Sequence, residues 1–163
     1  MQARYRKNKG YILIEAIIAI TIAVVGLLGI FALLSRSLSL NRVVSDRIVA
    51  SYLAAEGIEI VKNLIDNNIL AGKPWNAGIP NGTYEVDYMD TGLRPDSSRF
   101  INLNSETGAY GYAELVPTLM KRVITIRNSS DGEVITVGSR VNWTTRGGGK
   151  FDINLEEHLF HWR

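Results

Sequence analysis

The sequence predicts an α+β protein. A long N-terminal helix, whose first half spans a membrane, would pack on a C-terminal antiparallel β-sheet. Residues 11–34 contain 24 residues and a single charge, and apolar residues then recur every three or four positions as far as residue 69. Such steps follow one face of a helix. After Pro74 the period becomes two, and Gly, Asn, Thr, Tyr and Val dominate. That composition is typical of strands and turns.

We divide the 163-residue chain into a basic head (1–10), an apolar helical half (11–34), an amphipathic helical half (35–71) and a sheet domain (72–163). At 1.5 Å per residue the apolar half is roughly 36 Å long as a helix, enough to cross a bilayer. Gly72-Lys73-Pro74 is the first break, and it predicts one helix from about residue 11 to about residue 69. The apolar row of the amphipathic half, which we expect to lie on the sheet, comprises Leu40, Val44, Ile48, Tyr52, Ala55, Ile58, Val61, Ile65 and Ile69.

The sheet domain ends in a predicted three-stranded meander. Residues 119–128 form one strand, residues 133–145 the next, and alternating apolar residues from Phe151 the third. Turns are expected at residues 128–132 and 146–149, which are rich in Gly, Asn and Ser. Upstream, residues 84–88 alternate as a strand would, and residues 89–117 are irregular except for a short strand near residues 100–103.

The charge is unevenly distributed along the chain. The formal charge is +2, but Arg4, Arg6, Lys7 and Lys9 all precede Gly10. Without residues 1–10 the chain has 14 basic and 16 acidic residues, a formal charge of −2. A basic head before an apolar segment is a cytoplasmic retention signal under the positive-inside rule. No basic stripe interleaved with aromatics follows, so there is no direct signal for nucleic acid.

The sequence carries no pattern typical of an enzyme. The chain has no cysteine, which excludes disulfides, thiol catalysis and cysteine-based metal sites. No paired carboxylates, Ser/His/Asp set or phosphate loop stands out, and we expect no cofactor. His158 and His161 are three residues apart, so on a strand they face opposite sides and suit a shared metal poorly. We interpret Trp75, Trp143 and Trp162 as packing residues.

Three interpretations compete for the N-terminus. A secretory signal peptide needs a shorter apolar region and a small-residue cleavage box, which the stretch around Leu34 does not offer. A plain membrane anchor explains the basic head and the apolar segment but not Glu15. On the insertion scale an acidic residue at the centre of a span costs about 2.5–3.5 kcal/mol, and less near an end. An anchor alone has no reason to carry that cost.

The third interpretation is a family resemblance. Lys9-Gly10 followed by Tyr11-Ile12-Leu13-Ile14-Glu15 resembles the processing site of type IV prepilins. The resemblance implies that residues 1–10, with their four basic residues, are a leader that prepilin peptidase removes by cutting after Gly10. It also implies N-methylation of the new terminus, Tyr11. A glutamate at the fifth position after the cut, here Glu15, is the family's hallmark.

The resemblance extends beyond the processing site. LAAEGIEIVKNLIDNN, residues 53–68, is similar to the late helix of minor pilins of the pilus-modification (PilV) kind and of minor pseudopilins, and VNWTTRGGGKFDINLEEHLFHW resembles their final sheet. The chain departs from major pilins in two ways. Ala32 stands where they often have a kinking proline, and their C-terminal disulfide loop is impossible here. Both departures favour a minor subunit with a pilin-like fold.

The resemblance implies a structural subunit of a type IV pilus or of a related type II secretion or competence filament. Its partners would be the prepilin peptidase, other pilin or pseudopilin subunits, an inner-membrane assembly platform and, before assembly, the lipid bilayer. The precursor would cross the inner membrane once, with its leader in the cytoplasm and its C-terminal domain outside, and would then join an extracellular or periplasmic filament.

Cleavage would create a cationic amine on Tyr11, which the Glu15 of a neighbouring subunit can pair with in an apolar filament core. The alternative is a membrane-anchored protein that crosses the bilayer once, whose outer domain binds a ligand and never joins a filament.

Overall fold

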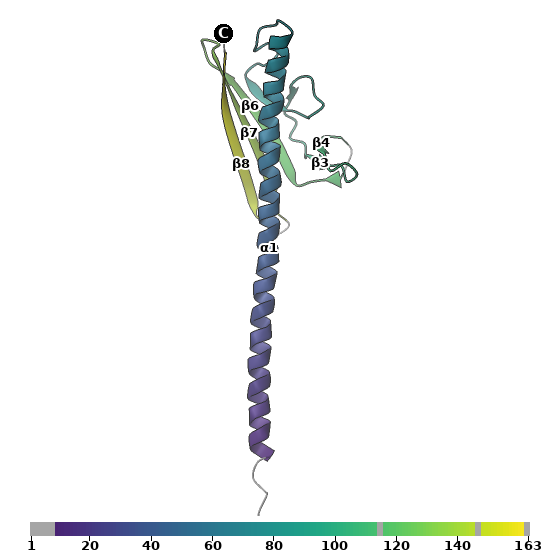
Figure 1. The fold of residues 1–163 in the computed structure, drawn as a ribbon, viewed down its shortest axis with the longest axis vertical. Helices are drawn as coiled ribbons and strands as arrows, with labels where there is room; N and C mark the ends of the chain where they lie inside the picture. The colour runs from purple at the N-terminus through teal and green to yellow at the C-terminus, as the bar shows by residue number, and fades with distance from the viewer. Residues whose placement is uncertain (1–8, 114–115, 146–147, 162–163) are drawn as a thin grey trace, which may run out of the picture. The chain divides into compact units, whose positions relative to one another are not determined.

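A computed structural model describes residues 9–113, 116–145 and 148–161, with side chains from Tyr11 onward. The chain divides into two compact units, Met1–Val44 and Ser45–Arg163, and each is described by itself. One helix and eight strands follow one another in the described residues (Figure 1). They are α1 (Lys9–Leu70), β1 (Gly82–Glu85), β2 (Arg94–Pro95), β3 (Asn102–Leu103), β4 (Tyr110–Gly111), β5 (Val116–Pro117), β6 (Met120–Asn128), β7 (Val134–Thr144) and β8 (Lys150–Phe160).

The helix α1 is continuous over 62 residues, which confirms the predicted single helix. It ends at the predicted break. The Gly72 N–H donates to the Ile69 carbonyl and the Lys73 N–H to the Asn68 carbonyl, while Gly72 has a φ of 67°. This pair of bonds is a Schellman cap, whose left-handed position favours glycine because it lacks a Cβ. Pro74 then prevents the helix from continuing.

The main sheet has five strands in the order β2-β1-β6-β7-β8, and every neighbouring pair is antiparallel. The predicted meander is confirmed as β6-β7-β8, with an unbroken register from Met120↔Trp143 to Asn128↔Ile135 between its first two strands. The expected strand at residues 84–88 is displaced toward the N-terminus: β1 begins at Gly82 and ends at Glu85. Beyond it the Asp87 and Asp90 carboxylates accept hydrogen bonds from nearby backbone N–H groups. Such local bonds compete with strand pairing.

Residues 89–117 are mostly irregular, as predicted, but they contain more strands than expected. β3 lies within the predicted range of residues 100–103, and it pairs with β4 and β5 in a second, three-stranded sheet. Each of these strands has two residues. A strand of two residues shows no alternation that a sequence pattern could reveal.

The core of the Ser45–Arg163 unit lies between α1 and the inner face of the main sheet. Strand β6 alternates buried and partly buried residues, and β7 does the same. Figure 1 shows β6, β7 and β8 beside the C-terminal part of α1. The helix lies close against the sheet at Gly57, where an added Cβ would lie 2.6 Å from Ile124 Cδ1 and 2.7 Å from Ser139 Oγ. Glycine therefore sets the distance between helix and sheet.

The predicted helix face was only partly right. Ile58, Val61 and Ile65 are buried on the sheet as expected. Ile48 and Tyr52 are 52% and 74% exposed, and Ala55 and Ile69 are exposed as well. The residues buried in their place include Ala50, Leu53, Ala54, Gly57 and Ile60. Close packing on the sheet selects small residues, which a count of large apolar side chains overlooks.

Candidate functional site

The N-terminal part of α1 presents an apolar surface without a cover. Every residue from Tyr11 to Arg42 is exposed, among them Leu13, Phe31 and Leu33. Soluble monomers rarely expose contiguous apolar patches larger than a few hundred Å². Among the described residues, α1 is the one helix that is long and apolar enough to cross a membrane. The structure is thus consistent with a membrane anchor at the N-terminus.

The predicted processing residues lie at the start of this helix. Lys9 and Gly10 open α1, whereas Arg4, Arg6 and Lys7 lie outside the described residues. Tyr11 and Glu15 are four residues apart on one helix, so they share a face about 6 Å apart along the axis. Glu15 is exposed and forms no ion pair with any side chain that the structure describes. Its carboxylate is therefore available to another chain.

A buried arginine joins the helix to the sheet. Arg122, in β6, is 2% exposed, and its Nη1 donates to the Leu53 carbonyl of α1 at 2.9 Å. Its Nη2 donates to the Val86 carbonyl at 2.6 Å, and the Glu56 carboxylate lies 3.4 Å from Nη1. Nothing in the sequence analysis singled out this residue. The sequence nevertheless contained a signal for its burial, because Arg122 lies at every-second-residue spacing between Met120 and Ile124, on the inward face of its strand.

A second buried charge, Glu85, organises the loop after β2. Its carboxylate accepts hydrogen bonds from the backbone N–H groups of Ser97 and Arg99, and it pairs with the Arg99 guanidinium at 2.7 Å. Burial raises the pKa of this carboxyl, but the bonds from Arg99 and Ser97 together outweigh it, and the net pKa is lowered. Ser98, between the two donors, has a φ of 58°. This strained conformation aims both N–H groups at one anion.

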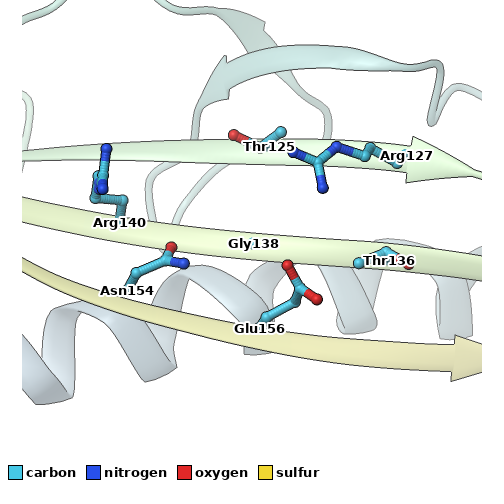
Figure 2. A pocket seen from close by; sticks show the side chains of 7 residues that line it. All are labelled: Thr125, Arg127, Thr136, Gly138, Arg140, Asn154 and Glu156. Atoms are coloured by element: carbon cyan, nitrogen blue, oxygen red, sulfur yellow. The ribbon is translucent and has the colours of Figure 1, made fainter.

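The outer face of the main sheet has a shallow polar hollow over Gly138, with a volume of about 250 Å³ (Figure 2). Arg140 is paired with Asp152 at 3.2 Å, and Glu156 faces His158 at 3.5 Å. These charged side chains are all exposed, and exposed ion pairs contribute little. The hollow is lined by Thr125, Arg127, Thr136, Gly138, Arg140, Asn154 and Glu156.

Two of the three tryptophans and both histidines singled out in the sequence lie among the described residues. Trp75 and Trp143 are buried, which confirms them as packing residues, while Trp162 lies outside the described residues. His158 accompanies Glu156 on the outer face, whereas His161 stacks on Trp75 with ring centroids 5.1 Å apart. The two histidines are thus on opposite faces, as predicted. No group of three or more potential ligands surrounds a possible metal position in the described part of the chain.

No family model, curated protein or solved structure matches this chain. The fold and the exposed helix define its class: an α+β protein with one long apolar N-terminal helix of membrane-spanning length.

Proposed function

We propose that this protein is a structural minor subunit of a type IV pilus or of a related type II secretion or competence filament. The observation that carries the proposal is Glu15, the one charge among residues 11–34. It lies on the exposed surface of a continuous helix, at the end of the stretch that resembles a prepilin processing site. The chemistry is done to this protein, and no catalytic role is proposed for it.

The proposed sequence of events begins in the inner membrane. Prepilin peptidase cuts after Gly10, where the smallest residue lets an enzyme approach the backbone closely. The Tyr11 amine that results is cationic, and a charged group is costly in an apolar surrounding. Pairing with Glu15 of a neighbouring subunit makes both charges tolerable and fixes the axial register of the subunits. The sheet domain would then lie at the filament surface.

The first test is the intact mass of the protein recovered from cells that contain a prepilin peptidase. Processing predicts the loss of residues 1–10 and a gain of one methylene group at Tyr11. A Gly10→Val variant should keep its full length, because the bulkier residue obstructs the approach of the peptidase. Recovery of the unmodified full-length chain would favour the membrane-anchored alternative that joins no filament.

The second test separates assembly from processing. Glu15→Leu should still be cut, but its share in sheared filaments should fall by about tenfold or more, since a buried amine without a partner is strongly disfavoured. Glu15→Asp is the matched control, because it keeps the charge and should assemble better than Glu15→Leu. Equal incorporation of Glu15→Leu and the parent chain would refute the proposed pairing.

A further inference from the structure

Strand β8 forms an open edge of the main sheet. All eleven of its residues pair with β7 in one uninterrupted register, from Val134↔Phe160 to Thr144↔Lys150. Among the described residues, none pairs with its other side. The strand contains no proline and no bulge, two of the devices with which proteins commonly block such edges. The opposite edge of the sheet is β2, which has two residues.

The hydrogen bonds show which backbone groups of β8 face outward. The His161 N–H donates to the Glu133 carbonyl, and the Thr145 N–H donates to the Gly149 carbonyl. Bonded and non-bonded pairs alternate in an antiparallel ladder. The odd-numbered residues of β8 therefore bond to β7, and the even-numbered residues, such as Asp152, Asn154 and Glu156, direct their N–H and C=O groups away from the sheet. Another extended chain can replace the solvent on such a row of groups and bond to it in register.

The inner side of this edge is apolar except for Glu157, and it is incompletely covered. Phe151 and Leu155 are 40% and 36% exposed, although they share the inner face of β8 with the half-buried Ile153. On the neighbouring two strands the corresponding inward residues are almost fully buried under α1. The helix thus covers β6 and β7 better than β8.

The exposed side of α1 borders one end of this edge. Ile48, Ala55, Lys62 and Ile69 are seven residues apart, nearly two turns, and so they form one line along the helix. Lys62 and Ile69 line a groove of about 340 Å³ together with residues 157–161, most of which belong to β8. The C-terminal part of the row, Lys62 and Ile69, therefore borders the C-terminal end of β8. A strand added to β8 would place its inward side chains between this row and the inner face of β8.

The charges around the edge indicate the chemistry of the added strand. β8 itself carries Lys150 and three carboxylates, Asp152, Glu156 and Glu157, which gives it a net charge of −2. A second copy of β8 would bring the same excess of carboxylates against it. Basic side chains on the solvent face of the added strand would instead meet Asp152 and Glu156, which remain about half exposed in their pairs with Arg140 and His158. Complementary charge favours association and orientation.

We propose that β8 receives an extended segment of a partner protein, which adds antiparallel to the sheet and alternates apolar with basic residues. Its apolar side chains cover Phe151, Leu155 and the exposed row of α1, while its basic side chains lie near Asp152 and Glu156. Main-chain hydrogen bonds hold the segment, and the alternation of its side chains gives selectivity. The proposal rests on the Ser45–Arg163 unit and is independent of the filament assignment.

The test uses the full chain in detergent micelles and a labelled synthetic peptide of alternating Val and Lys, about nine residues long, with binding followed by fluorescence anisotropy. Two further peptides carry N-methyl groups at alternate backbone nitrogens, one set at the Val positions and one at the Lys positions. Only one set faces β8, so one peptide should bind about tenfold more weakly or worse and the other about as well as the parent. No binding of the parent peptide, or equal binding of all three, would overturn the proposal.

Variants of the protein give an independent measurement. Asn154→Pro removes an outward N–H without removing a bond to β7, and proline is tolerated on edge strands. Asn154→Pro should lower the affinity for the Val/Lys peptide about tenfold, whereas Asn154→Thr should leave it unchanged. Glu156→Lys should also lower the affinity for the Val/Lys peptide and raise the affinity for a Val/Glu peptide. This second measurement does not depend on whether the proline variant folds. Unchanged affinities in Asn154→Pro and Glu156→Lys would contradict strand addition at this edge.

Discussion

Gly57 determines how closely α1 approaches the sheet, and replacing it with alanine tests that role directly. A Cβ at this position would lie 2.6 Å from Ile124 Cδ1, 2.7 Å from Ser139 Oγ and 3.0 Å from Arg122 Cδ. Ordinary carbon–carbon contacts are about 3.5–4.0 Å. The three neighbours belong to two strands and are all buried. Rotation of a single side chain therefore cannot relieve the overlap, and the helix must move away from the sheet.

The expected change in the free energy of unfolding is the sum of two opposing effects. Overpacking a core costs about 1–3 kcal/mol, and three close neighbours place Gly57→Ala near the upper end of that range. Alanine is about 0.8–1.0 kcal/mol better than glycine inside a helix, which acts in the opposite direction. We expect Gly57→Ala to lower the free energy of unfolding by about 2 kcal/mol. For a chain of this length that corresponds to a fall in melting temperature of about 4–8 °C.

The assay is denaturant unfolding of the full chain in detergent micelles, followed by the circular dichroism of the sheet domain. Ile124→Val removes the closest atom, Cδ1, and serves as the matched background. In a double-mutant cycle Gly57→Ala should cost clearly less in Ile124→Val than in the parent chain, because the two positions are in contact. The reasoning is refuted if Gly57→Ala is as stable as the parent, or if its cost is the same in both backgrounds.

Two further predictions concern the buried charges. Because the folded-state pKa of Glu85 lies below its ordinary value of 4.5, its carboxylate stabilises the fold above that pH, and this contribution is lost as the pH falls through the folded-state pKa. Glu85→Gln should be less stable by about 1–3 kcal/mol at pH 7. In urea unfolding the difference in stability between the parent chain and Glu85→Gln should narrow by pH 3. A difference that stays constant would show that the ionised carboxylate is not its cause. Glu56→Gln leaves the Arg122 guanidinium uncompensated and should cost about 1–3 kcal/mol, a value reduced because Glu56 is 33% exposed. Arg122→Met should cost more than Glu56→Gln, because it also leaves the Leu53 and Val86 carbonyls without their donors. A cost no greater than that of Glu56→Gln would contradict the stabilising role of these two bonds.

Much of the fold was predictable because its signals are local. The helix end follows from Gly72 and Pro74, which act within one turn. The meander follows from alternation along β6 and β7 and from the Asn-Ser-Ser-Asp-Gly turn between them. The end of β1 was missed because the Asp87 and Asp90 carboxylates accept hydrogen bonds from neighbouring backbone N–H groups, those of Tyr88 and Asp87. Alternation along the sequence does not reveal this competition.

The buried polar residues were less predictable, because their roles depend on partners far away in the chain. Glu85 is satisfied by residues 97–99, and Arg122 by carbonyls at residues 53 and 86. Spacing in the sequence does not identify the hydrogen-bond partners of either residue. The exposed flank of α1 is a similar case, since the apolar residues Ile48 and Tyr52 belong by period to the predicted core face.

The sequence by itself determined the long helix, its apolar half and the position of Glu15, because helix periodicity, hydropathy and charge are properties of neighbouring residues. The tertiary structure alone decided which side of that helix meets the sheet. Gly57 and its small neighbours lie on the side that meets the sheet, so Ile48 and Tyr52 of the predicted row stay exposed. The row left exposed beside β8 is the consequence, because a helix cannot bury opposite flanks on one sheet.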